Sequence, residues 1–263
     1  MGGLLELGLD SFLDTPADRT FTHHVIGTGD DHDADTQRTW MICGAQDSLG
    51  WRWLGTDTAN SDVVGPIGIE VYDPGLVPRR IYDQSNSEMS GILVRGLTVT
   101  SNRRLWVGYD PGGLDFVTGP PDSAHFNHLP ITDGSLRASR ACALCAASLC
   151  YGESLWVVTN NEVWRFNDAA TVLSRPAQNP LLLRGGMSTL AVKPLATGLD
   201  GAVWVATAGG LRVFRPGARS IPSPPSILPI PNDDVRAVAV DPSSGVVWAT
   251  TAGGPGALRS RST

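Results

Sequence analysis

Short apolar runs follow one another along the whole chain, and each is closed by glycine, proline, asparagine, aspartate or serine. The runs are about four to seven residues long and rich in valine, isoleucine, leucine and aromatic residues, which is typical of β-strands joined by tight turns. No window of about 11 residues carries the i, i+3, i+4 spacing of an amphipathic helix. The pattern therefore predicts an all-β chain with almost no helix.

A tryptophan followed by small or β-branched residues marks an internal repeat. It occurs five times, with spacings of 53, 50, 48 and 44 residues. The five segments are Trp53-Leu-Gly-Thr56, Trp106-Val-Gly-Tyr109, Trp156-Val-Val-Thr159, Trp204-Val-Ala-Thr207 and Trp248-Ala-Thr-Thr251. Periods of about 40 to 50 residues with four strands each are typical of a β-propeller, and a solenoid is the competing interpretation. We expect each of these tryptophans to pack between neighbouring sheets.

Each tryptophan strand is preceded by two apolar runs and followed by a turn and a short strand. This order predicts a single propeller domain over residues 1–263, built from five four-stranded repeats. Their approximate bounds are 20–75, 76–120, 121–170, 171–217 and 218–260. Residues 1–12 hold one further outer strand, because Gly2–Leu7 matches Gly209–Phe214.

The extra N-terminal strand allows two arrangements of the repeats. In a five-bladed ring, this strand completes the last repeat and joins the two ends of the chain. Alternatively, the chain is a fragment of a larger propeller. An incomplete ring leaves open strand edges, and open edges recruit partners, so the second arrangement predicts an edge-mediated dimer.

Composition and charge narrow the possible partners. Charged residues make up only 17% of the chain, the net charge is −6 and the pI is about 5.3. An acidic surface disfavours nucleic acid and anionic membrane surfaces. No apolar run approaches the length of a membrane-spanning helix. The N-terminus lacks the basic region of a secretory leader, so the chain as it stands is expected in the cytoplasm.

The phrases GAVWVATAGGLRVFRPG, RRLWVGYDPGGLDFV and GVVWATTAGG resemble the two-component-regulator propeller repeat. The resemblance extends over nearly all of the chain. It implies a bacterial sensor-type propeller, periplasmic or extracellular, that has no enzymatic activity. Such a propeller would bind a small molecule, a glycan or a protein at one mouth of the ring.

Two other functions remain open. Asp200-Gly-Ala-Val-Trp204 is similar to the repeat of streptogramin-lyase propellers, which implies a lyase or hydrolase with metal or histidine chemistry near the central channel. The candidates for that chemistry are His125, His128, Glu88 and Glu153. The third possibility is a truncated remnant without activity.

The densest polar cluster follows the run Phe21–Ile26 in the first repeat, and its binding candidates are Asp30, Asp31, His32, Asp33 and Asp35. Clustered carboxylates suit calcium, and the candidate metal ligands are Asp31, Asp33 and Asp35. A solvated acidic loop is the alternative interpretation. No other cofactor is expected.

Further polar residues occupy the corresponding connections of other repeats. The binding candidates there are Glu88, Asp133, Asp233 and Asp234. Such residues either close turns through bonds from side chain to backbone or line one mouth of the ring. The chain contains no GxSxG, HExxH or P-loop motif, so no catalytic residue is predicted.

Overall fold

The computed structural model describes residues 3–7, 21–25, 39–58, 68–110, 113–129, 141–149, 152–159, 162–166, 181–182, 195–214, 232–241 and 243–258. Every regular element in these ranges is a β-strand, as the apolar pattern predicts. Within them, no helix has the length and apolar character needed to cross a bilayer.

Three antiparallel sheets have four strands each, and neighbours in a sheet are consecutive in the chain. The first sheet contains β3 (Thr39–Gln46), β4 (Arg52–Thr58), β5 (Ile69–Tyr72) and β6 (Pro78–Tyr82). The second sheet contains β7 (Leu93–Val99), β8 (Leu105–Asp110), β9 (Leu114–Thr118) and β10 (His125–His128). The third sheet contains β11 (Ala141–Leu149), β12 (Gly152–Thr159), β13 (Glu162–Phe166) and β14 (Leu181–Leu182).

Three smaller sheets complete the described part of the chain. The fourth sheet contains β15 (Leu195–Thr197), β16 (Val203–Thr207) and β17 (Gly210–Phe214). The fifth sheet contains β18 (Val235–Val240), β19 (Val247–Thr251) and β20 (Gly254–Leu258). The N-terminal sheet consists of β1 (Gly3–Leu7) and β2 (Phe21–Val25).

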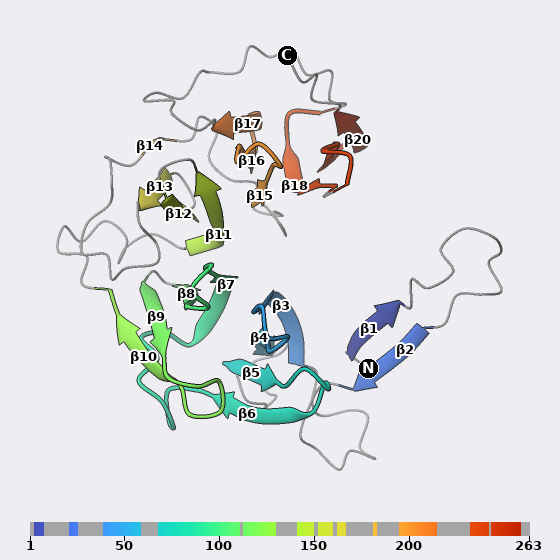
Figure 1. Cartoon of the computed structure of the whole chain (residues 1–263). Helices are drawn as coiled ribbons and strands as arrows, with labels where there is room; N and C mark the ends of the chain where they lie inside the picture. The colour runs from blue at the N-terminus through green and yellow to red at the C-terminus, as the bar shows by residue number, and fades with distance from the viewer. Residues whose placement is uncertain are drawn as a thin grey trace.

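The sheets follow one another around a common centre (Figure 1). The first strand of each numbered sheet lies nearest that centre, so that β3, β7, β11, β15 and β18 are neighbours in turn. This arrangement places strands such as β6 and β10 on the outer side. Each numbered sheet therefore stacks face to face on the next one.

The sheets begin one strand later than the predicted repeats. The sequence assigns residues 78–82, 125–128 and 181–182 to the start of a new repeat, whereas β6, β10 and β14 are the last strands of the preceding sheets. The turn after β5 explains the difference. Asp73 N–H donates to the Val77 carbonyl at 3.1 Å, and Leu76 N–H donates to the Asp73 carbonyl at 2.9 Å. So tight a turn returns the chain to the same sheet.

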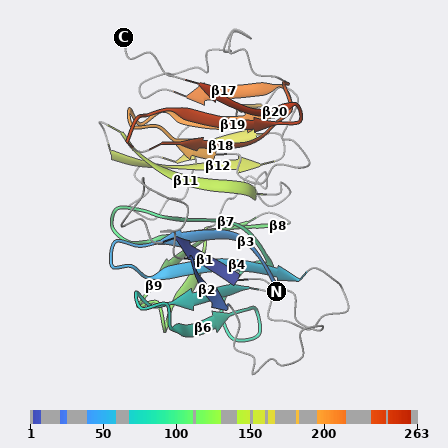
Figure 2. The ribbon, with the colours of Figure 1, turned by 90° about the vertical axis from the view of Figure 1, so that its right-hand side faces the viewer.

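The N-terminal strand does not complete the fifth sheet. β1 pairs with β2, in a register that runs from Gly3 opposite Val25 to Leu7 opposite Phe21. Figure 2 shows β1 and β2 beside β3 and β4, at the opposite end of the stack from β18–β20. The described strands therefore do not show the expected pairing of this strand with the last repeat, and the blade count and closure of the ring stay predictions.

Four of the five repeat tryptophans are buried between successive sheets, as predicted. Trp53, Trp106, Trp156 and Trp204 belong in turn to the four apolar cores that join the first sheet to the second and so on to the fifth. Aromatic contacts cross these interfaces. The rings of Trp156 and Phe214 are 5.1 Å apart between centroids, and those of Tyr82 and Phe126 are 5.2 Å apart.

The fifth repeat tryptophan departs from the prediction. Trp248 lies opposite Ala239 on the first strand of its sheet, as Trp204 lies opposite Ala196. Trp248 nevertheless remains 52% exposed, whereas Trp204 is buried. The reason is that no sheet of the described chain covers this face of the fifth sheet.

The two tryptophans give a matched pair of stability variants. Trp204→Ala should lower the free energy of unfolding by about 3–5 kcal/mol, because it empties a buried site between two sheets. Trp248→Ala should lower it by less than about 1 kcal/mol, because half of that ring is already in water. Urea denaturation of both variants checks this. Equal losses would contradict the difference between the two faces.

In four sheets, the turn between the first two strands contains a residue with positive φ. Gly50, Gly201 and Gly245 occupy this place with φ of 87°, 75° and 69°. In the second sheet the place belongs to Arg103, with φ of 64°. A side chain is strained in this left-handed region, and glycine is not.

Replacing Arg103 by glycine should therefore stabilise the protein. The strain relieved exceeds the entropy that glycine adds to the unfolded chain, and we expect Arg103→Gly to raise the free energy of unfolding by about 0.5–1 kcal/mol. Gly201→Arg is the control and should lower it. Chemical denaturation measures both variants, and a destabilised Arg103→Gly protein would show that the turn is not strained.

Candidate functional site

The predicted acidic cluster lies outside the described residues. Asp30, Asp31, His32, Asp33 and Asp35 fall between β2 and β3, and Asp133 falls between β10 and β11. Their roles in binding, and the calcium site at Asp31, Asp33 and Asp35, stay predictions. Among the side chains that the structure describes, no three histidine, cysteine or acidic residues form a group suited to a metal ion.

The connection between the first two sheets, residues 83–92, holds itself in place through its own hydrogen bonds. Asp83 Oδ1 accepts the hydroxyl of Ser85 at 2.5 Å and the N–H groups of Ser85 and Asn86 at 2.7 and 3.1 Å. These bonds, the Ser85 hydroxyl above all, hold the pKa of Asp83 below its usual value. Gln84 Nε2 donates to the Met89 carbonyl at 3.3 Å. The 83–92 connection is thus an ordered element that can position side chains.

Glu88, a predicted binding residue, projects from this connection against β10. Its carboxylate lies 3.4 Å from His125 Nδ1 and accepts the Phe126 N–H at 3.5 Å. Its own backbone N–H, followed by the His125 ring, lowers the pKa of Glu88. Because β10 is an outer strand, His125 and His128 do not lie near the central axis, where the sequence placed them.

Asp233 and Asp234, also predicted to bind, lie in the segment that leads into β18. The Asp233 carbonyl accepts the Gly210 N–H at 2.7 Å, and the Asp234 carbonyl accepts the Ala252 N–H at 3.1 Å. Asp234 Oδ2 lies 3.4 Å from Arg236 Nε. The backbone of this acidic pair therefore joins the turns that open β17 and β20, and a part in binding stays a prediction.

A buried carboxylate that the sequence analysis missed lies at the start of β9. Asp115 is fully buried, and both of its oxygens are occupied. Oδ1 accepts the Ser90 hydroxyl at 2.7 Å and lies 3.1 Å from His128 Nδ1. Oδ2 accepts the Ser90 N–H at 2.9 Å and the Tyr109 hydroxyl at 2.8 Å. Burial of Tyr109 and the nearby carboxylate raise the tyrosine pKa well above its usual value.

A comparison of the five repeats could have revealed this cluster from the sequence. The third residue after the tryptophan is threonine in four repeats, and Thr207 and Thr251 use the hydroxyl to close the next turn. In the second repeat that residue is Tyr109. A Cβ atom added at Gly91 would lie 2.6 Å from Tyr109, so the glycine makes room for the ring. The tyrosine that replaces the repeat threonine thus bonds to Asp115.

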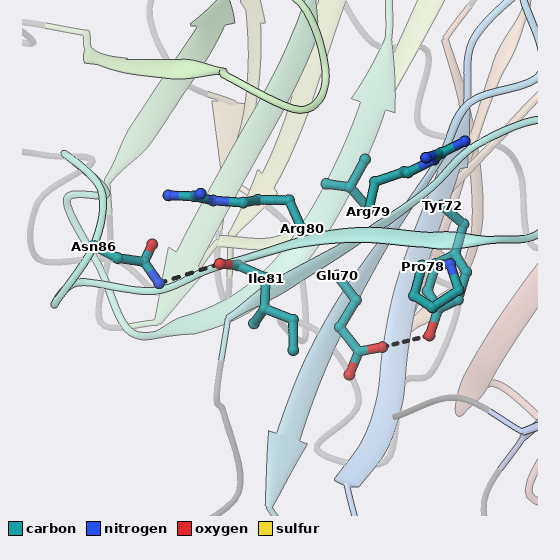
Figure 3. Close-up of a pocket in the computed structure, with 8 residues that line it drawn as sticks. Glu70, Tyr72, Pro78, Arg79, Arg80, Ile81 and Asn86 are labelled. Carbon is teal, nitrogen blue, oxygen red and sulfur yellow. Dashed lines mark hydrogen bonds between the residues drawn. The ribbon is translucent and has the colours of Figure 1, made fainter. Parts of the chain in front are cut away.

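A pocket of about 450 Å³ lies on the outer half of the first sheet (Figure 3). Its principal polar residues are Glu70, Tyr72, Arg79, Arg80 and Asn86, and Val71, Pro78 and Ile81 complete the lining. Asn86 brings the 83–92 connection to the pocket and donates from Nδ2 to the Ile81 carbonyl at 3.1 Å. The pocket is therefore formed by β5, β6 and the ordered 83–92 connection together.

Glu70 is the most unusual group of the pocket because it is only 3% exposed. Its Oε2 accepts the Tyr72 hydroxyl at 2.7 Å. Burial raises the pKa of Glu70, and the bond from Tyr72 offsets this only in part.

The two arginines of the pocket are held by different contacts. A bulge between β5 and β6 falls at Arg79, and bulges re-aim side chains. Arg79 Nε donates to Asp73 Oδ2 at 2.8 Å. The guanidinium of Arg80 lies over the Tyr82 ring, 5.5 Å from its centroid. In Figure 3, both guanidinium groups extend to the side of β6 opposite the Glu70 carboxyl group.

Of the Asp115 cluster and the pocket of the first sheet, the pocket is the better binding site. In the Asp115 cluster every oxygen of the carboxylate is engaged, and the Ser90 hydroxyl donates to it, so this serine is not activated for attack. The lining of the pocket instead has guanidinium groups on one side of β6, and a buried carboxyl group with a phenol on the other. This combination suits a polar ligand held by hydrogen bonds.

Comparison with known proteins finds likeness only at the level of structure. No family model matches the chain, and no curated protein matches it. The extracellular domain of the hybrid two component system BT4673 from B. thetaiotaomicron superposes with a TM-score of 0.62 and 17% identity, covering 84% of this chain and 27% of that one. The corresponding domain of BT3049 from B. thetaiotaomicron gives 0.60 and 16%, covering 85% and 28%. The Dos1 propeller gives 0.50 and 11%, covering 87% and 74%.

These comparisons define the class of fold. The chain is an all-β protein with several four-stranded antiparallel sheets and the architecture of propeller-type domains. It structurally resembles the propeller ectodomains of bacterial two-component sensors and spans about a quarter of the length of the two sensor domains described above.

The raised pKa of Glu70 predicts a dependence of stability on pH. The folded protein holds this proton to higher pH than the unfolded chain, whose glutamates titrate near 4.5. The contribution of Glu70 to the free energy of unfolding should therefore decrease as the pH rises above 4.5. Urea denaturation at several pH values compares the wild type with Glu70→Gln, and the difference should be constant below this range.

Glu88→Gln is the control for the sign of this effect. The pKa of Glu88 is lowered in the folded protein, so its contribution should be present at neutral pH and be lost as the pH falls. Parallel pH profiles for the two variants would show that the environments of the two glutamates do not differ as described.

Proposed function

We propose that the chain is a recognition domain without enzymatic activity, which binds a small hydroxylated acid, such as a uronic acid, in the pocket of the first sheet. The observation that carries the proposal is a pocket on the first sheet that is lined by guanidinium groups on one side of β6 and by Glu70 and Tyr72 on the other. A volume of about 450 Å³ falls within the range of small-molecule sites.

The chemistry of the lining favours this ligand class. A guanidinium group pairs with a carboxylate through two parallel hydrogen bonds. Hydroxyl groups both donate and accept hydrogen bonds, as a phenol does, and a carboxyl oxygen accepts them. The 83–92 connection and the Asp73–Arg79 contact order the lining before a ligand arrives, which lowers the entropic cost of binding.

The structural neighbours are consistent with this role. BT4673 and BT3049 are described as hybrid two component systems, and the matched parts are extracellular domains. By analogy, this chain would recognise a ligand and pass the signal to other parts of a larger system. A glycan or protein bound at one mouth of the ring, with Asp233 and Asp234 in contact, stays a second prediction from the sequence.

The alternative of a lyase or hydrolase receives no specific support from the described geometry. Its candidates His125 and His128 lie on the outer strand β10, and His128 contacts a carboxylate that is fully engaged. We therefore favour binding over catalysis.

Calorimetric titration with glucuronate and galacturonate, and with glucose as the neutral reference, tests the proposal. We expect one of the two acids to bind more tightly than glucose. Arg80→Ala should weaken that binding about tenfold or more, because it removes a charged hydrogen-bond donor.

Arg104→Ala is the matched control, because this arginine also lies over an aromatic ring, 5.4 Å from the centroid of Phe116, but in the second sheet. It should leave the affinity unchanged. The proposal is contradicted if neither acid binds, or if the two arginine variants lose affinity equally.

A further inference from the structure

Two buried nitrogen donors of the second sheet have no acceptor among the residues that the structure describes. They are Nη1 of Arg104, which comes directly before β8, and Nε1 of Trp106, which lies in this strand. The Trp106 side chain is fully buried, and Arg104 buries its Nη1 atom although the residue as a whole is only half-buried. A buried donor without an acceptor destabilises the folded protein, most of all when it is charged. A partner that accepts from both groups is therefore expected.

Both donors border the ring of Phe116 on β9. Arg104 and Trp106 are two residues apart, so their side chains leave the same face of the strand. The guanidinium carbon of Arg104 lies 5.4 Å from the centroid of Phe116. The centroids of Trp106 and Phe116 are 5.8 Å apart, and these two residues are paired in register. One small ligand beside this ring is therefore within reach of both donors.

The remaining described surroundings favour an anion over a water molecule. Trp106 and Phe116 belong to the core shared with the third sheet, which contributes only apolar and aromatic side chains, namely Leu155, Val157, Trp164 and Phe166. Among the described residues, no carboxylate forms an ion pair with Arg104. A buried water needs acceptors for its own hydrogens as well as donors. An anion only accepts, and its charge also compensates the guanidinium.

The turn before β8 holds the backbone of Arg104 in place. The Arg104 carbonyl accepts the Thr100 N–H at 3.0 Å, and the Arg104 N–H donates to Asn102 Oδ1 at 3.2 Å. The Arg103 N–H donates to the Thr100 carbonyl at 2.8 Å. The guanidinium thus extends from an ordered turn, which lowers the entropic cost of binding a ligand.

The third sheet contains a similar arrangement with one difference. The guanidinium of Arg165 lies over the Trp156 ring, 5.5 Å from its centroid, and Trp156 Nε1 also has no acceptor among the described residues. Arg165 Nε, however, donates to the hydroxyl of the buried Ser154 at 3.4 Å. The buried Nη1 of Arg104 has no such acceptor in the described part of the chain. The second sheet is therefore the stronger candidate for an anion.

We propose that a small monovalent anion, chloride or an ion of similar size, binds beside Phe116 and accepts hydrogen bonds from Arg104 Nη1 and Trp106 Nε1. Because Trp106 and Phe116 pack against the third sheet, the ion would stabilise the contact between the second and third sheets. The inference does not depend on the ligand proposed above, because that pocket lies on the first sheet.

Thermal unfolding of the whole chain at constant ionic strength tests the proposal. Sodium chloride replaces sodium methanesulfonate, whose anion is larger, so that screening of surface charge stays the same. An ion that binds only the folded state stabilises it, and we expect chloride to raise the Tm of the wild type by at least ~2 °C. Arg104→Met and Trp106→Phe should each lose most of this increase, because each removes one donor and keeps an apolar side chain. Arg104→Met carries the test by itself if Trp106→Phe does not fold.

Arg103→Met is the matched control. Arg103 is exposed in the same turn, so losing the same charge there should leave the chloride effect intact. Crystals grown in sodium bromide should show anomalous signal within hydrogen-bond distance of Arg104 Nη1 and Trp106 Nε1. The proposal is overturned if the wild-type Tm does not depend on chloride, or if Arg104→Met keeps the full increase. A water molecule instead of bromide at this position would also overturn it.

Discussion

The structure depends on one constraint: a sheet of three or four strands has two faces, and each apolar face must be covered by a neighbouring sheet. The repeat tryptophan meets this constraint, since its ring is too large for one sheet to enclose. Four times the ring is buried in a core shared with the next sheet, with cross-sheet partners such as Phe214. Where no described sheet follows, Trp248 stays half exposed.

The same packing decides where polar groups are tolerated inside the stack. Glu70 and Asp115 occupy equivalent positions, each paired in register with the residue after a repeat tryptophan. Both are buried carboxylates, but their partners differ. Asp115 accepts hydrogen bonds from Ser90 and Tyr109, whereas Glu70 is bonded by Tyr72 and lines a pocket. One position of the repeat thus serves a fixed network in one sheet and an accessible site in another.

Most of the architecture could be predicted from the sequence, because period and apolar alternation are local properties. The phase of the repeat, that is, which consecutive strands form one sheet, could not be predicted, because strand order along the chain does not say to which sheet an outer strand belongs. Turn geometry decides this, and Asp73-Pro-Gly-Leu76 carried that signal. The pocket was missed because Glu70 and Asn86 are polar residues without a motif, and only pairing of β5 with β6 brings them together. Of the predicted binding residues, Glu88, Asp233 and Asp234 lie in connections between sheets.

A double-mutant cycle between Trp156 and Phe214 tests the central claim most directly, because these rings belong to different sheets and are 5.1 Å apart. Trp156→Leu, Phe214→Leu and the double variant are compared by urea denaturation, with the same-sheet pair Trp106 and Phe116 as reference. Packing between sheets predicts a coupling energy of about 0.5–1.5 kcal/mol for Trp156 and Phe214. Additive losses for this pair, with coupling retained in the reference pair, would contradict the account.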